Sequence, residues 1–254
     1  MPLHIARLDD APGSPFPPVG VARAEPDGLL ALGGDLAPAR LLDAYRHGIF
    51  PWFSEGEPIL WWSPSRRAVF RTDGVRLSSR RRRELRRSHW RVRADGAFEA
   101  VIHACAHRPR PGQPGGTWIT AGMIAAYTGL HRLGHAHSIE VFDRDEDGEE
   151  HLVGGLYGLA IGRMFCGESM FSARPGASTV ALAALARRLH GWGWPLLDAQ
   201  VPNDHTRSLG VETWSRDDYL RALERLRDAP EPAGDWRGRF GEIPAAALAA
   251  GTPD

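Results

Sequence analysis

Apolar residues return every three or four positions in several stretches of this chain, which is the spacing of one face of an α-helix. In residues 36–50, Leu41, Tyr45 and Ile49 follow this spacing, and Pro38 stands near the first turn, where its missing N–H costs nothing. Similar stretches recur along the sequence. The pattern predicts helices over residues 36–50, 96–107, 120–133, 177–190 and 217–227, and the serines that open SSRRRRELRRS, which can cap a helix, predict another over 78–88.

Three consecutive stretches show the alternation of apolar and polar residues that is typical of β-strands. An acidic turn, DRDEDGEE, separates the first two of these stretches, which cover residues 137–143, 152–162 and 163–172. Short turns join antiparallel neighbours, so the sequence predicts an antiparallel meander. A short apolar strand over 195–200 comes after the longest helix, and the polar residues Asn203, Asp204 and His205 then predict a loop.

The order helix, three-stranded meander, helix, strand, helix is that of a mixed α/β (α+β) fold of the acyl-CoA N-acyltransferase (GNAT) type. We expect a small N-terminal domain with an aromatic pocket wall over residues 1–65 and an acetyltransferase-like catalytic domain over 66–228. Residues 229–254 are rich in Ala, Pro and Gly and predict a loose tail, from which Trp236 and Phe240 dock back on the fold.

The composition is that of a globular protein, with 43% hydrophobic residues in 254 and a net charge of zero. All 31 basic residues are arginine. The absence of lysine excludes mechanisms that need a lysine nucleophile, a Schiff base or the lysine of a Walker-type phosphate loop. Any binding of phosphate must therefore use arginine or backbone N–H groups.

The neutral total conceals a strongly basic segment. Residues 66–93 hold twelve arginines against Asp73 and Glu84. Like charges one helical turn apart repel one another, and a solvated helix face usually mixes both signs, so this run favours phosphate binding over a merely solvated surface. In the helix expected over 78–88, the arginines that share one face are Arg82, Arg83, Arg86 and Arg87.

The cysteines and the apolar runs indicate where such a chain works. Cys105 and Cys166 are too few for a disulfide scaffold, which favours free thiols in a reducing compartment. No apolar run approaches the length of a membrane span, and MPLHIARLDDAPGSPFPP lacks the basic-then-apolar pattern of a secretory signal. We expect a cytoplasmic protein without a membrane partner.

Two regions have the residue types of a binding site. The segment PWFSEGEPILWWSPS (51–65) is so rich in tryptophan that it predicts either a small aromatic core or the wall of an apolar pocket. Glu168, Asp198 and Gln200 lie within apolar strand sequence, where an unpaired carboxylate is costly. Either carboxylate alone fits a structural ion pair as well as a site, whereas the group together favours a site.

Long blocks of the sequence are similar, in matching order, to those of a known family. They are GLLALGGDL, HGIFPWFS, ILWWSP, GTWIT, LGHAHSIEV, LVGGLYG, FCGESMFS and LLDAQVPNDHTRSLG. Over residues 16–226 the chain resembles the leucyl/phenylalanyl-tRNA–protein transferases, and aromatic-rich blocks of this length are far more specific than a short glycine motif. The loop PRPGQPGG (109–116) and the tail after 228 depart most from the family, so no role is carried over to them.

The resemblance implies transfer of Leu or Phe, and less well Met, from aminoacyl-tRNA to the N-terminal α-amine of a protein that begins with Arg or Lys. The product would carry a signal for N-end rule degradation. No metal or nucleotide cofactor is implied.

The resemblance also implies which residues bind the substrates. An apolar amino-acid pocket, in which shape discriminates by about 1–3 kcal/mol per methylene, would be lined by Trp52, Trp118, Leu156, Phe165, Met170, Ser172, Leu185 and Leu197. A contact with the terminal adenosine is implied for Tyr45 and Tyr127, which helical spacing alone makes packing residues. Phosphate contacts that orient tRNA without reading its bases are implied for Arg82, Arg83, Arg86 and Arg87.

The chemistry needs positioning more than it needs a strong base. The aminoacyl ester supplies the driving force, and about a tenth of an N-terminal amine is neutral at pH 7. The family account makes Asp198 act through Gln200 on that amine. A neutral amide is a poor base, so we expect Gln200 to orient the amine through its carbonyl oxygen and Asp198 to give electrostatic support or accept a proton. Glu168 would hold an ammonium or guanidinium group of a substrate.

Two other enzymes compete with this interpretation. An acetyl-CoA-dependent N-acetyltransferase would need a glycine-rich pyrophosphate loop before the long helix, where SARPGAST offers only Arg174 and Gly176. A cysteine hydrolase would use Cys166, but its apolar neighbours favour an inert buried thiol.

A metal site and an RNA-binding module are two further interpretations. A metal site from His131, His135 and His137 has no acidic ligand nearby, and Gly134 breaks the helix between the first two. A noncatalytic RNA-binding module would explain the arginines but would leave Glu168 and Asp198 without a role.

Overall fold

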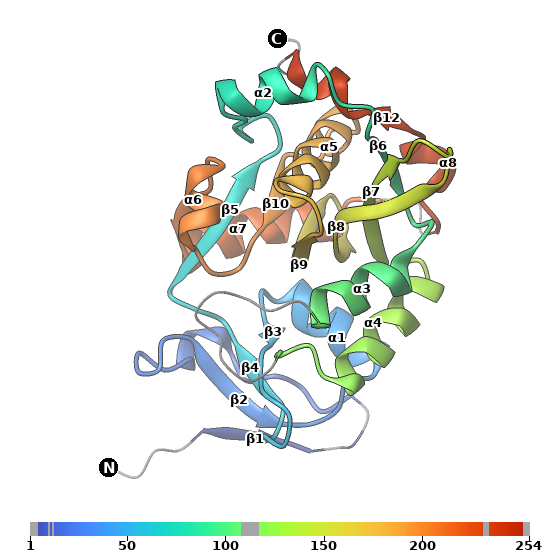
Figure 1. The fold of residues 1–254 in the computed structure, drawn as a ribbon. Coiled ribbons are helices and arrows are strands. Elements are labelled where there is room, and N and C mark those ends of the chain that lie inside the picture. The colour runs from blue at the N-terminus through green and yellow to red at the C-terminus, as the bar shows by residue number, and fades with distance from the viewer. Residues whose placement is uncertain (1–4, 10, 12, 108–116, 231–233, 251–254) are drawn as a thin grey trace.

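The computed structural model describes residues 5–9, 11, 13–107, 117–230 and 234–250, and it has a mixed α/β fold with two sheets (Figure 1). Within these residues the larger sheet has eight strands in the order β11-β5-β10-β9-β8-β7-β6-β12, and the smaller has four in the order β1-β2-β4-β3. The mixed α/β fold predicted from the element order is confirmed. The loop at 109–116 lies outside the described residues.

The centre of the larger sheet is the antiparallel meander that the alternation predicts. Its strands are β7 (Ala136–Arg144), β8 (Glu150–Ile161) and β9 (Met164–Ser172). Gly162, at φ +55°, stands in the two-residue turn between β8 and β9, where the left-handed conformation suits glycine. The meander supplies most of the surface on which the helices pack.

A crossover after the meander opens the sheet. The chain leaves β9, forms α5 (Ala177–Gly191) and returns as β10 (Leu196–Asp198), which is parallel to β9. Within β9, β10 pairs with Met164–Cys166 but not beyond, and in the described residues no strand pairs with 167–172 on that side. A gap thus forms at the carboxyl ends of β9 and β10, which is where open α/β sheets bind ligands.

Helices cover both faces of the larger sheet (Figure 1). Successive strand residues point to opposite faces, and the buried side chains accordingly form two clusters. One face presents Tyr157 and Cys166 to α1, α3, α4 and α7, while the other presents Leu156 and Phe165 to α5. These helices are α1 (Pro38–Arg46), α3 (Phe98–His107), α4 (Ala121–Arg132) and α7 (Arg216–Arg227).

The strands of the smaller sheet lie within residues 6–62. Its strands are β1 (Ala6–Leu8), β2 (Leu29–Gly33), β3 (Phe50–Pro51) and β4 (Leu60–Trp62), and a 3₁₀ turn, η1, covers Val19–Val21. The helix predicted over 36–50 is shorter than expected, because Gly48 at φ +73° turns the chain into β3. Trp61 and Tyr45 belong to the same buried cluster as Tyr157 of the larger sheet. A domain boundary at residue 65 therefore stays a prediction.

The remaining elements complete the larger sheet and its surroundings. They include the strands β5 (Arg66–Arg71), β6 (Arg91–Ala94) and β11 (Glu212–Ser215) and the helix α2 (Ser79–Leu85). The loop predicted around Asn203 is wrong in part. Asn203 accepts a hydrogen bond from the Thr206 N–H at 2.9 Å and caps the short helix α6 (Asp204–Ser208).

The loose tail predicted for 229–254 is wrong for residues 234–250. This segment forms α8 (Arg237–Phe240), the edge strand β12 (Ile243–Pro244) and the 3₁₀ turn η2 (Ala245–Ala249). The docking of its two aromatic residues is confirmed: Trp236 is 2% exposed and stacks on His137 with ring centroids 3.8 Å apart, and Phe240 is fully buried. Burial of two large aromatic side chains outweighs a composition that favours disorder.

Candidate active site

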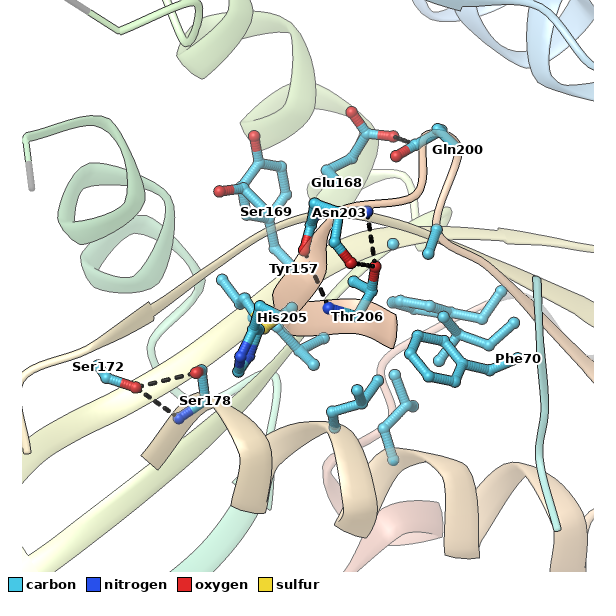
Figure 2. Close-up of a pocket in the computed structure, with 18 of the residues that line it drawn as sticks. Phe70, Tyr157, Glu168, Ser169, Ser172, Ser178, Gln200, Asn203, His205 and Thr206 are labelled. Carbon is cyan, nitrogen blue, oxygen red and sulfur yellow. Dashed lines mark hydrogen bonds between the residues drawn. The ribbon is translucent and has the colours of Figure 1, made fainter. Parts of the chain in front are cut away.

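A cavity of about 610 Å³ lies where β9 and β10 separate, and it has an apolar and a polar end. Figure 2 shows Glu168 and Gln200 facing one another at one end and Phe70 among apolar side chains at the other. The polar end holds a carboxyl and an amide, which suits an amine. The apolar lining comes from Phe70, Trp118, Leu156, Phe165, Met170, Leu182, Leu185 and Leu197.

A β-bulge places Glu168 at this opening. Tyr157 pairs with Ser169, and the next residue, Gly158, pairs with Gly167, so Glu168 is the additional residue on β9. A bulge redirects a side chain relative to the regular alternation. Gly158 is required opposite the bulge, because a Cβ there would lie 2.2 Å from the carbonyl oxygen of Cys166.

The Glu168 carboxyl is held by three side chains from three different elements. Its Oε1 accepts from the Tyr45 hydroxyl at 2.6 Å and from Gln200 Nε2 at 2.9 Å, and its Oε2 accepts from the Tyr127 hydroxyl at 3.1 Å. Burial raises the pKa of Glu168 to about 7, with a further rise from the nearby charge of Asp198, and the three hydrogen bonds limit the increase. A carboxyl of this kind both takes and releases a proton near neutral pH.

Asp198 lies beneath the cavity floor and does not line it. Its Oδ1 accepts from Arg67 Nε at 2.8 Å and from the Gln200 backbone N–H at 2.9 Å. Its Oδ2 accepts from Arg67 Nη2 at 2.6 Å and from the Tyr219 hydroxyl at 2.9 Å. Four donors thus surround a carboxylate that is fully buried. Asp198 therefore has a structural role and does not contact a substrate directly.

Arg67 is the partner that makes this burial possible. Its side chain is 2% exposed, and the guanidinium lies over the rings of Phe50 and Tyr219 at 4.8 and 4.5 Å from their centroids. Burial alone would lower the pKa of Arg67, but Asp198 raises it well above the ordinary value. The bidentate geometry is the strong form of an arginine–carboxylate pair.

Gln200 connects the two carboxyl groups. Its backbone has φ +53°, a left-handed conformation that is uncommon for a residue with a side chain. The hydrogen bond from its N–H to Asp198 holds that conformation, and the side chain then reaches Glu168. The Asp198–Ala199–Gln200 turn therefore fixes where the amide points.

Most of the residues expected to line an amino-acid pocket do line the cavity. The structure brings together Trp118, Leu156, Phe165, Met170, Ser172, Leu185 and Leu197, with Glu168 and Gln200 at the polar end. Trp52 does not belong to the lining: it is 41% exposed and packs against Trp62 at a centroid distance of 6.1 Å.

The adenosine contact expected for Tyr45 and Tyr127 is not available in this structure. Both rings are fully buried, and their hydroxyl oxygens lie 2.5 Å apart next to Glu168. Helical spacing, which makes both of them packing residues, is the better guide here. Their phenols support the carboxyl instead of meeting a nucleotide.

Some lining residues were not singled out from the sequence. Phe70, Ser178 and Leu182 belong to ordinary apolar or helical sequence, whereas Tyr157, Ser169 and Ala199 lie within the blocks that match the family. Asn203 and His205 lie in the last of these blocks, and their polar type and their place after a strand end are further cues that mark them as lining.

The arginine cluster divides into exposed and inward-turned side chains. Arg83, Arg86 and Arg87 are exposed, and none of them forms an ion pair among the described residues. Arg82, in contrast, borders a small cavity with Ala183 and Leu248, and its Nε is buried. The expectation that all four share one outward face is wrong for Arg82, because its side chain lies against α5 and η2.

The basic helix lies beside the cavity. Arg81 of α2 donates through Nη1 to the Pro175 carbonyl at 3.2 Å, in the turn before α5. In the same turn the Ser172 hydroxyl accepts from the Ser178 N–H at 2.9 Å, and both serines line the cavity. The turn before α5 thus contacts both the arginine-rich helix α2 and the lining of the cavity.

The same turn disfavours coenzyme A. A pyrophosphate loop needs open N–H groups at the start of the helix, but Ser172 occupies the N–H of Ser178 and Arg174 occupies that of Ala177. The guanidinium of Arg81 also fills the space beside Gly176, within 2.0 Å of where a Cβ would stand.

A cysteine hydrolase and a histidine metal site also find little support. Burial raises the pKa of the Cys166 thiol well above its ordinary value, which is the reverse of an activated nucleophile. The structure does bring an acidic residue near two of the histidines: Asp95 lies 2.8 Å from His137 Nδ1 and 3.9 Å from His131 Nδ1. Even so, no group of three or more His, Cys, Asp or Glu side chains in the described residues is placed to hold a metal ion.

Comparisons with known proteins show which family the sequence resembles. The family model described as leucyl/phenylalanyl-tRNA protein transferase matches residues 69–224, and the model of the N-terminal domain of the same family matches 34–65. A leucyl/phenylalanyl-tRNA–protein transferase of Xanthomonas euvesicatoria pv. vesicatoria (strain 85-10) is 64% identical over 95% of this chain and 94% of its own length. One of Xylella fastidiosa (strain 9a5c) is 57% identical over 92% and 94%.

Solved structures are much more distant. The crystal structure of FemX aligns with a TM-score of 0.47 at 9% identity, over 73% of this chain and 71% of that one. Sequence carries the assignment: because the family model covers more than half of the chain and relatives of over 60% identity cover nearly all of it, this protein belongs to the leucyl/phenylalanyl-tRNA–protein transferase family.

Proposed function

We propose that the enzyme moves Leu or Phe, and less well Met, from aminoacyl-tRNA to the N-terminal α-amine of proteins that begin with Arg or Lys. The extended protein would then be recognised by the N-end rule degradation pathway in the cytoplasm. The observation that carries the proposal is the cavity at the β9–β10 opening, which joins an apolar pocket to a carboxyl–amide pair. In the described part of the chain, no helix has the length and apolar character needed to cross a membrane.

The apolar end of the cavity suits the side chain of the transferred amino acid. Phe165 and Leu197 close it on the sheet side and Leu182 and Leu185 on the α5 side. Met170 borders the same space, and a flexible thioether adapts to both a branched aliphatic and an aromatic group. Such a pocket excludes charged side chains because nothing in the apolar end pairs with them.

The exposed arginines suit the phosphates of the tRNA. Arg83, Arg86 and Arg87 have no acidic partner among the described residues, so their charges are available to a polyanion. Because α2 is tied to the turn before α5 through Arg81 and Pro175, a tRNA on this helix would have its aminoacyl end near the cavity. Such contacts orient the donor without reading its sequence, as an enzyme that accepts several tRNAs requires.

The polar end suits the acceptor amine. Gln200 would orient the amine through its amide, and Glu168 would hold the ammonium form. Asp198 supports this arrangement through the Gln200 backbone, and the direct proton acceptance expected from the sequence does not fit its burial. We also infer that residues 66–228 are an acetyltransferase-like unit, which the separation of two parallel strands beside a crossover helix supports.

The test is transfer of labelled Leu from charged tRNA to an Arg-starting peptide. A Gly-starting peptide and an acetylated Arg peptide of the same sequence are the controls, and labelled acetyl-CoA is offered as a competing donor. We expect label on the free Arg peptide alone and only from the tRNA. Label from acetyl-CoA, or equal labelling of the Gly peptide, would contradict the proposal.

A further inference from the structure

Two carboxyl groups lie within reach of Gln200, and their surroundings differ sharply. Asp198 has both oxygens filled by the Arg67 guanidinium, the Tyr219 hydroxyl and the Gln200 N–H. A proton could reach it only after one of these four hydrogen bonds breaks inside the core. Removing a buried arginine from its partner is costly, so Asp198 is poorly placed to take part in a proton transfer.

Glu168, unlike Asp198, has a carboxyl oxygen that can accept a further hydrogen bond. Its Oε1 accepts from Tyr45 and Gln200, but its Oε2 accepts from Tyr127 alone among the described residues. The residue is half-buried and lines the cavity, whereas Asp198 is fully buried. A second proton-donating group in the cavity can therefore reach Oε2.

The hydroxyls around Glu168 are arranged for a carboxyl that carries a proton part of the time. Three O···O contacts join Tyr45, Tyr127 and Glu168, at 2.5, 2.6 and 3.1 Å. Burial raises the pKa of both phenols well above the ordinary value, so each keeps its one proton. The two phenolic protons can make only two of these three contacts into hydrogen bonds. A proton on Glu168 would supply the donor for the third.

On the basis of the proposed function, we propose that Glu168 is the catalytic proton acceptor for the amine, and that Arg67 and Asp198 are positioning residues that act through the Gln200 backbone. The acceptor binds as an ammonium against Glu168 Oε2. One N–H bond breaks, its proton passes to Oε2, and the electron pair stays on nitrogen. That pair forms the bond to the ester carbonyl carbon, and the bond from this carbon to the ribose oxygen breaks.

The protons balance in this sequence. The ribose oxygen leaves with the electron pair of the broken bond and takes a second proton from the same nitrogen, which ends as an amide N–H. Glu168 then returns its proton to the solvent. Because the pKa of Glu168 is about 7 and that of an N-terminal amine is about 7.7–8.0, the first transfer is nearly even in free energy.

The test compares two acceptor peptides. One has an ordinary N-terminal amine, which binds as an ammonium and needs the proton transfer to Glu168, and the other has a terminal aminooxy group, which is already neutral throughout the working range. The titratable groups facing Glu168 are Tyr45, Tyr127, Asp198 and Cys166, and Tyr157 and His205 also line the cavity. With the amine peptide at a saturating concentration, we expect wild-type kcat to rise with pH and level off around neutrality. Turnover of the aminooxy peptide should depend little on Glu168.

With the amine peptide, Glu168→Gln should lower kcat by about 10²–10⁴-fold and remove the acid limb, with little change in the KM for aminoacyl-tRNA. Tyr45→Phe removes a donor that lowers the pKa of Glu168, so the limb should move to higher pH. Asp198→Asn should lose activity but keep the limb. Glu140→Gln is the matched control, because burial also raises the pKa of Glu140 to about 7 although it lies outside the cavity.

The outcomes separate the possible errors. A Glu168→Gln enzyme with wild-type kcat and an unchanged limb, or a limb lost in Asp198→Asn but kept in Glu168→Gln, overturns this inference alone. A Glu168→Gln enzyme whose KM for the peptide rises while kcat holds shows that Glu168 only binds the acceptor. If the wild-type protein transfers nothing from aminoacyl-tRNA, the proposed function fails and this inference fails with it. Should Glu168→Gln not fold, the direction of the shift in Tyr45→Phe decides.

Discussion

Arg67 and Asp198, 131 residues apart, form a bidentate ion pair with N···O distances of 2.8 and 2.6 Å. Both side chains are excluded from solvent. The pair joins β5 to the end of β10 directly under the turn that carries Gln200. The core of the enzyme is thus built around a charge pair that also determines where the amide of the site stands.

Removal of one member of this pair should be strongly destabilising. Arg67→Met leaves the Asp198 carboxylate buried without its counter-ion, and we expect the free energy of unfolding to fall by about 3–5 kcal/mol. Arg71→Met on the same strand breaks an exposed pair with Glu212, which should cost at most about 1 kcal/mol. Urea unfolding of both variants measures the difference, and equal losses would show that the burial of the Arg67 pair carries no special weight.

Charge reversal on α2 should weaken the binding of the donor tRNA. Arg83→Glu combined with Arg86→Glu should raise the KM for aminoacyl-tRNA by roughly tenfold or more and flatten its dependence on salt, because fewer counter-ions are released. Turnover of aminoacyl-adenosine, which lacks the remaining phosphates, should not change. Arg221→Glu with Arg225→Glu on α7 makes the same change in net charge elsewhere. Equal loss with both donors would contradict the assignment of these arginines to tRNA.

The α5 wall of the pocket should set the preference between Leu and Phe. Leu185→Ala removes three carbon atoms from the lining, so we expect the ratio of kcat/KM for Phe over Leu to rise about tenfold. Leu189→Ala is one turn further along the helix and equally buried, but it does not line the cavity. Both changes should cost about 2–5 kcal/mol of stability, and only the first should change the preference. An unchanged ratio in Leu185→Ala would place the amino acid elsewhere.

Stability should fall as pH rises through the weakly acidic range, in part because of Glu140. Burial raises its pKa in the folded protein from 4.5 to about 7, so the folded state holds a proton that the unfolded state has lost. Its contribution is fully present below pH 4.5 and is lost as pH approaches 7, by up to about 3 kcal/mol. Glu140→Gln should flatten the curve of unfolding free energy between pH 4.5 and 7. A curve as steep as that of the wild type would show that Glu140 titrates normally.

Local signals predicted the elements well, because their causes are local. Thr120 and Ser78 cap the helices that follow them, with hydrogen bonds of 3.3 and 3.2 Å to the third N–H group, and the alternation of the meander follows from its two buried faces. Composition wrongly predicted a loose C-terminal segment. The burial of Trp236 and Phe240 stabilises this segment more than its many small residues destabilise it.

The sequence predicted most residues that line the cavity, but it did not predict the charged and hydrogen-bonded groups around Glu168 and Asp198. The family blocks indicated Phe165 and Met170, yet no pattern marks Arg67 among twelve neighbouring arginines as the one that is buried. The bulge at Glu168 depends on a register that only the paired strands define. Both features arise from contacts between segments far apart in the chain, which a sequence pattern does not encode.

The edge strand β12 has a consequence for how the molecule is made. Ile243 of β12 pairs with Val92 of β6, but it is synthesised about 150 residues later. Until β12 is available, the backbone N–H and C=O groups at this edge of β6 lack their strand partner. The apolar surface beside His137 that Trp236 covers also stays exposed to solvent. We therefore expect a nascent or prematurely terminated chain to be vulnerable to aggregation and proteolysis until the C-terminal segment has been synthesised and has docked.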